Sequence, residues 1–588
     1  MRIFNYTLLN FNSIKNTIKR FPFTIISASL ATIFLILSTF DEYAEAYNNK
    51  LMSLGLVFVF GIFLYAFIKL FNEGLRNYYD LKNLKNNNFF KILSYVITLP
   101  ILYGIYELVY DKGQALSHYN SNFIYFTLIA ALVVGTSFVG KFNYHKDYVV
   151  YVAYVAKILK AFIISNIYSF IVFIGVSGII YALNTLFKLN FSSSIYLRVG
   201  IFSFILFNVV TFFSDFPKVR DSFIDYKYPK AFKILLVYIM TPIVIIYTGI
   251  LLAYFVKILW LWQIPNNLIV NLVIWFASFS VVYLFFLSRI DSIKFINKFK
   301  IVFPFTLFPL LGMMFFAIYL RIQEYGITEN RYIVIAAGVW IFLSLIYYIF
   351  YRENSNITIP IFLSVIILIT GLGPASATSL SVRSQNTRFE KLLKENKMIA
   401  GDEIKANVNV ESSTKSQIID IVSYMVRTDR VDKLSYMPKD FKLNEDSFTK
   451  LFGFSNIVED KDYLGYSYAD NIAKNSELGF NIDVEGYKKI IFVYSLDNVV
   501  TSGEYKFEKN KKEIKIYKKS HDDYKKVFTI DLAKLRDNLK LLKKTKDHIE
   551  LEDLAMENNE YKVIFSDIYF GKEDKSEDSY IEFYFLIK

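Results

Sequence analysis

Cysteine is absent from all 588 residues, and only four histidines are present. The absence of cysteine excludes disulfides, thiolate metal sites and a cysteine nucleophile. The histidines, at positions 118, 145, 521 and 548, have no metal-ligand spacing. The motifs G-x-S-x-G, H-E-x-x-H and G-x-G-x-x-G are also missing. We therefore predict no catalytic residue, no metal site and no cofactor.

Charged residues are scarce as well, at 20% of the chain against 54% hydrophobic residues, and the mean hydropathy is +0.34. This apolar content exceeds what a soluble core of this size needs. It is organised in runs of about twenty residues, the length that crosses roughly 30 Å of hydrocarbon. Eleven such runs predict membrane-spanning helices at 22–40, 51–71, 89–110, 123–143, 161–187, 195–213, 231–260, 266–287, 301–320, 332–351 and 357–379.

Lysine and arginine alternate between rich and poor loops along these runs. Counted loop by loop, about 21 fall on one side and about 6 on the other. The positive-inside rule then predicts a cytoplasmic N-terminus (1–21), a transmembrane domain (22–380) in the cell inner (cytoplasmic) membrane, and an extracytoplasmic C-terminal part. Since the net charge of +13 is concentrated in these short loops, it does not indicate nucleic-acid binding.

After residue 380 the composition becomes that of a soluble protein with near-balanced charge. We predict a helical linker (381–430), with amphipathic helices at 383–398 and 417–426, followed by a β-rich domain (431–588). Its expected strands are 489–496, 505–508, 513–518, 527–530, 561–569 and 580–587, with a helix at 531–544. The predicted fold class is thus a predominantly α-helical polytopic membrane protein of about eleven spans, with a C-terminal soluble α+β, β-rich domain.

Residues 135–141, GTSFVGK, match the first seven positions of a phosphate-binding Walker A loop. The eighth position is Phe142, which lacks the hydroxyl that binds magnesium, and no soluble strand precedes the stretch. We therefore interpret Gly135 and Gly140 as sites of close helix packing.

Several ionisable residues lie near the outer ends of the predicted spans, where charge is costly and by default suggests function. In one interpretation these residues do not contact one another: the acids lie in headgroup water, and Lys257 extends its ammonium group to the interface. The alternative is one polar cluster that forms an interface or holds a ligand. The candidate residues are Glu107, Lys257, Arg321, Glu324, Tyr325, Glu329 and Arg331.

The stretch 317–332, AIYLRIQEYGITENRY, joins an outgoing span to a returning one and contains most of these candidates. Gly326 can adopt positive φ and end the first helix, and Thr328 is placed to cap the second. Glu329 then lies in a first helical turn, which favours an acid. We expect Arg321 and Arg331 to bind carboxylates or backbone carbonyls, so that the stretch forms a structural clamp.

The same stretch, together with 228–259, Gly373-Pro374, Ser384-Gln385 and Leu392-Leu393, resembles the bacterial membrane-protein family known as domain of unknown function 4153 (DUF4153). The resemblance covers roughly residues 15–400. It implies a polytopic membrane protein and carries no assigned activity. Members often have a bulky aromatic after the Gly-Pro, where this chain has Ala375.

Three classes of function remain open. We favour an envelope structural or interaction protein that presents its extracytoplasmic domain to a protein or envelope ligand. A transporter of a small solute would place charges near the midplane of the membrane. A membrane enzyme acting on a lipid-linked substrate would need acids gathered at one face. The expected partners are membrane lipids and that extracytoplasmic protein or ligand, with no nucleic acid, and no sequence pattern sets an oligomeric state.

Overall fold

The computed structural model divides the chain into two compact units, Met1–Asn456 and Ile457–Lys588, and each is described by itself. The described residues are 11–40, 44–81, 88–111, 114–115, 119–141, 148–189, 191–221, 223, 226–261, 268–351, 356–438, 441–455, 464–467, 484–493, 499–510, 512–520, 523–545, 551–570 and 580–588. The four histidines and Phe142 lie outside these residues.

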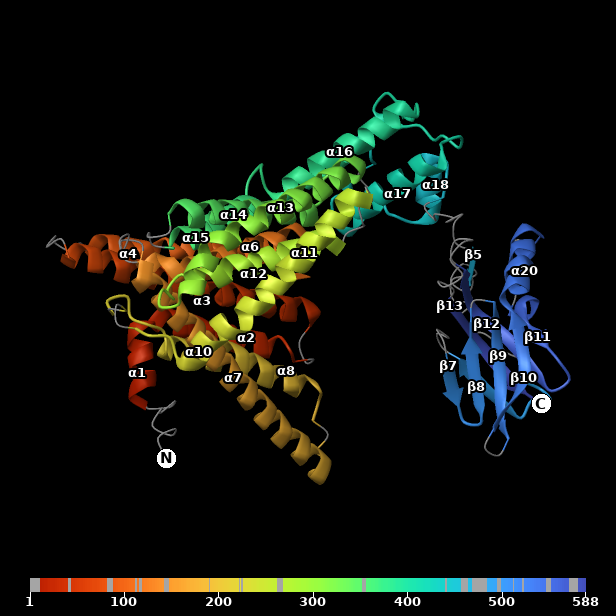
Figure 1. The fold of residues 1–588 in the computed structure, drawn as a ribbon, viewed down its shortest axis with the longest axis horizontal. Helices are drawn as coiled ribbons and strands as arrows, with labels where there is room; N and C mark the ends of the chain where they lie inside the picture. Colours follow the sequence, from red (N-terminus) through yellow and green to blue (C-terminus); the bar gives the residue numbers. More distant parts are fainter. Residues whose placement is uncertain are drawn as a thin grey trace. The chain divides into compact units, whose positions relative to one another are not determined.

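The first unit consists mainly of long apolar helices (Figure 1). Up to residue 371 its helices are α1 (Phe11–Arg20), α2 (Pro22–Leu37), α3 (Glu45–Leu81), α4 (Asn88–Val96), α5 (Thr98–Val109), α6 (Tyr119–Phe138), η1 (Val139–Lys141), α7 (Tyr148–Phe187), α8 (Ser194–Ile201), η2 (Phe202–Phe207), α9 (Asn208–Ser214), α10 (Lys230–Ile234), η3 (Leu235–Met240), α11 (Thr241–Leu261), α12 (Leu268–Leu287), α13 (Lys294–Tyr325), α14 (Glu329–Phe350) and α15 (Thr358–Gly371). Two short antiparallel strands, β1 (Tyr110–Asp111) and β2 (Gln114–Ala115), lie between α5 and α6.

Each of the eleven predicted spans coincides with a helix or a run of adjoining helices, but not all reach membrane length. Within the described residues, nine helical segments are long and apolar enough to cross, or up to ten if the bent α1–α2 pair counts as one span. The two short segments are α2, with 16 residues, and α15, with 14 residues. At 1.5 Å per residue they measure only about 24 Å and 21 Å. The eleventh span, expected over 357–379, ends at Gly371 because the chain turns at Gly373-Pro374.

Three basic side chains, Arg20, Lys141 and Arg289, hold the connection between α9 and α10 against neighbouring helix ends. Arg20, at the end of α1, forms an ion pair with Glu73 of α3 at 2.8 Å. The contacts to carbonyl oxygens run from Arg20 to Phe216 and Pro217, from Lys141 to Val219 and Asp221, and from Arg289 to Phe223 and Tyr226.

The Walker-like stretch contributes Lys141 to this arrangement, and its ammonium is fully buried. A Cβ atom on Gly135 would lie 2.7 Å from the Phe67 ring, and one on Gly140 would lie 2.8 Å from Val219 Cγ2. The glycines therefore permit close packing, as predicted from the sequence.

Three further helices complete the first unit: α16 (Ala377–Glu395), α17 (Ser412–Arg427) and α18 (Glu445–Phe452). They share one core that includes Phe389, Val422 and Phe448. The short elements between them are β3 (Ile399–Ala400), β4 (Glu403–Ile404) and η4 (Val431–Lys433). We call residues 377–455 the helical module.

Two details of the helical module differ from expectation. Helix α16 begins at Ala377 rather than near 383, because the Ser376 side chain caps it by accepting from the Ser379 backbone N–H at 3.2 Å. The division between the units falls after Asn456 rather than at 430/431, since α18 packs with α16 and α17.

The second unit contains two antiparallel sheets that share one apolar core. One sheet has the order β10-β9-β8-β7; the other has the order β11-β12-β13-β6, with β5 paired to β12. Its elements are β5 (Leu464–Ser467), β6 (Lys489–Val493), β7 (Val499–Ser502), β8 (Tyr505–Lys509), β9 (Glu513–Ser520), β10 (Asp523–Asp531), α20 (Leu532–Thr545), η5 (Leu551–Leu554), β11 (Met556–Glu557), β12 (Tyr561–Phe570) and β13 (Tyr580–Ile587). The six predicted strands and the helix at 531–544 correspond to elements of this unit. Alternation explains the sheets: Ile514 and Ile516 are buried, whereas the neighbouring Lys515 is only half-buried.

Candidate functional site: a polar cluster where α13 meets α14

The connection between α13 and α14 turns at Gly326, which has a φ of +71°. Its backbone N–H bonds to the Ile322 carbonyl at 2.9 Å and so ends α13. A Cβ atom at this position would lie 2.7 Å from Arg388 Cδ. Glycine is therefore required both by the backbone conformation and by the close approach of α16.

Side chains of α16 bind the main chain of this connection. Gln385, which is buried, donates to the carbonyls of Tyr325 at 3.0 Å and Ile327 at 2.9 Å. Ser384 Oγ accepts from the Ile327 N–H at 2.9 Å. Arg388 Nη1 donates to the Tyr325 carbonyl at 2.8 Å. Polar main-chain groups that the tight turn leaves without intrahelical partners are thereby satisfied.

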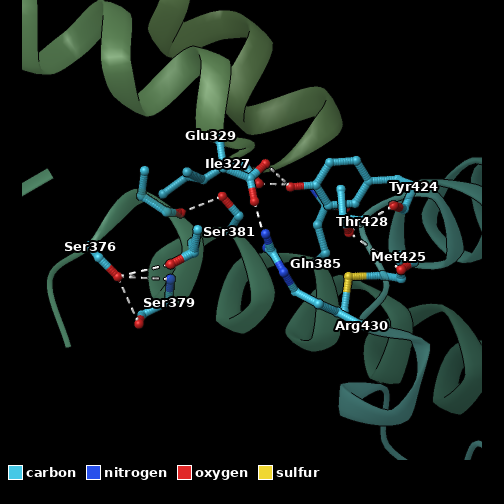
Figure 2. A network of polar contacts seen from close by, with 12 residues as sticks. Ile327, Glu329, Ser376, Ser379, Ser381, Gln385, Tyr424, Met425, Thr428 and Arg430 are labelled. Carbon is cyan, nitrogen blue, oxygen red and sulfur yellow. Dashed lines mark hydrogen bonds and ion pairs between the residues drawn. The ribbon is translucent and has the colours of Figure 1, made fainter. Parts of the chain in front are cut away.

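Glu329 begins α14 and is the centre of a buried ion pair (Figure 2). Arg430 Nη1 donates to Glu329 Oε1 at 2.5 Å, and the two side chains are only 8% and 5% exposed. The Tyr424 hydroxyl donates to the other carboxylate oxygen of Glu329. The carboxylate thus has a partner on each oxygen, which a buried charge requires.

Tyr424 and Arg430 come from α17 and from the residue just before η4, so the pair joins α14 to the helical module. Burial raises the pKa of the Tyr424 hydroxyl, and the hydrogen bond to Glu329 raises it further. The hydroxyl therefore stays protonated and remains a donor at neutral pH.

Arg430 also approaches α6, because its guanidinium carbon lies 5.2 Å from the centre of the Tyr119 ring. Its Nε and Nη2 atoms are buried and make no hydrogen bond with any part of the chain that the structure describes. The cation–π contact with Tyr119 is therefore the interaction available to this side of the guanidinium. The cluster consequently ties together α6, α14 and the helical module.

The seven residues predicted from the sequence divide into two groups. Glu329, Arg331, Tyr325 and Glu324 all belong to the connection, and Arg331 Nη1 donates to the carbonyls of Tyr325 and Gly326 at 3.2 and 2.6 Å. The Glu324 carbonyl accepts from Arg388 Nη2 at 3.0 Å, whereas its side chain is exposed.

The other three residues are not joined to the connection by side-chain bonds. Arg321 is half-buried and makes no hydrogen bond or ion pair with a described residue, so the clamp does not use it. Glu107 of α5 is exposed beside Tyr103, and Lys257 of α11 is exposed. Thr328 occupies the N-cap position with extended backbone but makes no capping hydrogen bond through its side chain. The ligand-binding role predicted for the seven residues stays a prediction.

Sequence reasoning did not place Arg388, Tyr424 or Arg430 in the site. Ser384 and Gln385 entered only through the family resemblance. One local signal was present: Ser381, Gln385 and Arg388 share one face of α16 at spacings of four and three residues. Ser381 and Gln385 are buried. A buried polar stripe of this kind indicates contact with main-chain groups rather than with an apolar core.

In the described part of the chain, the length and apolar composition of the helices are typical of a multi-pass membrane protein. The chain belongs to the family described as domain of unknown function (DUF4153), whose profile matches residues 26–407. The resemblance noted in the sequence is thereby confirmed. The match includes the α13–α14 connection and Gln385 and ends before Tyr424 and Arg430. No curated protein and no solved structure matches the chain.

Proposed function

We propose that this protein is a structural or interaction protein of the bacterial cell envelope, anchored in the cytoplasmic membrane by eleven crossings. In this proposal the N-terminus is cytoplasmic and both the helical module and the β-rich unit are extracytoplasmic. The helical module serves as a rigid mount on the outer ends of the membrane helices, and the β-rich unit contacts the extracytoplasmic partner. The observation that carries the proposal is the buried Glu329 carboxylate, held by Tyr424 and Arg430 of the helical module.

Eleven crossings are supported by the partners at both ends of the two short helices. Asn356, just before α15, donates to Ser288 after α12 at 2.9 Å. The Ala375 carbonyl, just after α15, accepts from Tyr332 at the start of α14 at 2.7 Å. Helix α13, which is of membrane length, separates Ser288 from Tyr332, so these two contacts support a crossing by α15.

The same reasoning applies to α2. Arg20, which precedes α2, pairs with Glu73 near the end of α3. The Phe40 carbonyl, which follows α2, accepts from Asn48 near the start of α3 at 3.0 Å. These two contacts support a crossing by the 16-residue α2 alongside α3. A locally thinned bilayer or snorkelling of flanking residues accommodates such short helices.

A structural role is favoured over transport by where the buried charges lie. In the described part of the membrane helices, the buried charged residues are Lys141 and Glu329. Lys141 ends η1 and Glu329 begins α14, so both lie at helix ends. Both are engaged by the chain itself, whereas a transporter places its charges near the midplane, where a substrate can reach them.

Cysteine accessibility tests the orientation cleanly, because the natural chain has no cysteine to remove. Lys450→Cys lies on α18 and Lys227→Cys lies in the α9–α10 connection, and both positions are exposed. In intact spheroplasts a membrane-impermeant maleimide should label position 450 and not position 227. Permeabilised cells should label both. Labelling of position 227 alone in intact spheroplasts would reverse the proposed orientation. The helical module would then be cytoplasmic.

A further inference from the structure

The β-rich unit contains a cleft of about 740 Å³ between the end of the β9–β10 hairpin and the turn that leads into β12. This volume is within the range of small-molecule sites, roughly 300–1,000 Å³. The hairpin contributes Lys518, Lys519, Lys525 and Lys526, and the turn contributes Asn558, Asn559, Glu560 and Tyr561. Because side chains alternate along a strand, Lys518 and Lys525 share one face of the sheet, whereas Lys519 and Lys526 lie on the other.

The strand register brings two of these lysines face to face. Lys518 of β9 pairs directly with Lys525 of β10, and Tyr505 of β8 is opposite Lys518 on its other side. The Lys518 ammonium lies 5.7 Å from the centre of the Tyr505 ring. Like charges directly opposite each other on one sheet face destabilise the pairing. An anion between the two ammonium groups would relieve this repulsion.

Lysines elsewhere in the same sheet have their own acids. Lys506 pairs with Glu508 at 2.5 Å, and Lys515 pairs with Glu513 at 2.8 Å. The four cleft lysines, in contrast, form no ion pair with any residue in the described ranges. The half-buried Lys518 and the exposed Lys525 therefore lie opposite each other without a carboxylate partner among the described residues.

The opposite wall supplies amide donors beside the single carboxylate of Glu560. Asn558 Oδ1 accepts from the backbone N–H groups of Glu560 and Tyr561 at 2.9 and 2.8 Å. This uses the acceptor oxygen of the side chain, so the polar group that remains available is its amide N–H₂. Ammonium groups together with amide donors match the acceptor-only oxygens of phosphate.

We propose that this cleft binds a phosphate-bearing ligand with at least two negative charges. The ligand's oxygens would lie between Lys518 and Lys525 and relieve their repulsion. This inference does not depend on which side of the membrane the unit occupies.

The first test is a calorimetric titration of the full-length protein, in nanodiscs of zwitterionic lipid, with inorganic tripolyphosphate. Wild-type protein should bind, and its Kd should rise when salt increases from about 50 to about 200 mM, since the contacts are ionic. The Lys518→Gln/Lys525→Gln variant should weaken binding by at least about tenfold. The matched variant Lys506→Gln/Lys515→Gln, which removes lysines that already have acids, should bind within about twofold of wild type. No binding by the wild type, or an equal loss in both double variants, would refute the site.

A second variant separates binding from folding. Lys525→Glu places an acid opposite Lys518, so the thermal transition of the β-rich unit should move upward while tripolyphosphate binding is lost. A lower transition temperature together with unchanged binding would contradict the proposed repulsion.

Hydrogen exchange identifies the source of the phosphate. If amides of β9, β10 and residues 558–561 become protected in nanodiscs containing phosphatidylglycerol before tripolyphosphate is added, the ligand is a lipid headgroup. If protection needs tripolyphosphate, the ligand is a soluble or polymeric phosphate. Absence of protection under both conditions would rule out the cleft as a phosphate site.

Discussion

Replacement of Glu329 by Gln nearly preserves the shape of the side chain but leaves the Arg430 guanidinium buried without a counter-charge. Both side chains are less than 10% exposed, so solvent cannot take over the lost interaction. Removal of one partner of a buried pair typically costs about 3–5 kcal/mol. At 1.4 kcal/mol per factor of ten, the fraction of molecules with the helical module detached should rise by between roughly a hundredfold and a few thousandfold.

Hydrogen exchange of the α17 amides measures this detachment directly. We expect their protection to fall by that factor in Glu329→Gln and in Arg430→Met. The protection of α12 amides should be unchanged, because α12 packs within the bundle. In the double variant no uncompensated charge remains, so its loss should be smaller than the sum of the two single losses.

Arg321→Ala is the matched control for this experiment. Arg321 is half-buried and unbonded, so its removal should change stability by no more than about 0.5 kcal/mol. From sequence alone Arg321 and Glu329 were both expected to belong to the clamp, and the structure gives hydrogen-bonded partners only to Glu329 of the two. Wild-type protection of α17 in both Glu329→Gln and Arg430→Met would refute the reasoning.

Three further predictions concern other parts of the chain. Gly326→Ala should lower the melting temperature of the detergent-solubilised protein by more than Gly373→Ala does: both residues have positive φ, but only Gly326 has α16 atoms within 3 Å of the new Cβ. Tyr424→Phe should cost about 1.5–3 kcal/mol at neutral pH, because a hydrogen bond to a buried carboxylate is lost. The pKa of Tyr424 is raised in the folded state, so this residue's contribution to the stability of the wild type should be lost as pH rises above about 10. The Phe variant has no hydroxyl to ionise, so the difference in melting temperature between wild type and variant should narrow at alkaline pH. Residues 457–588, expressed alone, should show a cooperative urea transition, since both sheets and α20 share one core; a gradual, non-cooperative loss of far-UV signal would show that the unit needs the membrane part.

Much of the fold was readable from the sequence because the signals are local. An apolar run of about twenty residues has to lie in lipid or in a core, whatever its neighbours are. Alternating side chains likewise indicate a two-faced strand, as at Ile514 and Ile516. The turn at Gly326 was predictable for the same reason, since a glycine between two helical patterns offers the backbone conformation that ends a helix.

The number of helices that reach membrane length was less accessible. Hydropathy does not reveal that α15 ends at Gly371, within the predicted span 357–379, or that the Ser376 cap begins α16 at Ala377. The unit boundary was also displaced, because the core shared by α16, α17 and α18 depends on which apolar faces meet rather than on composition.

The sequence by itself therefore determined the membrane class, the family and the positions of the helices and strands. Only the tertiary structure decided which charges are paired. Glu329 pairs with Arg430, which lies 101 residues further along the chain. Lys518 lies opposite Lys525 because of the register between β9 and β10. Secondary structure follows from steric and hydrophobic preferences that act over a few residues. The partner of a buried charge depends instead on the packing that brings distant segments within about 3 Å, and no local pattern encodes that distance.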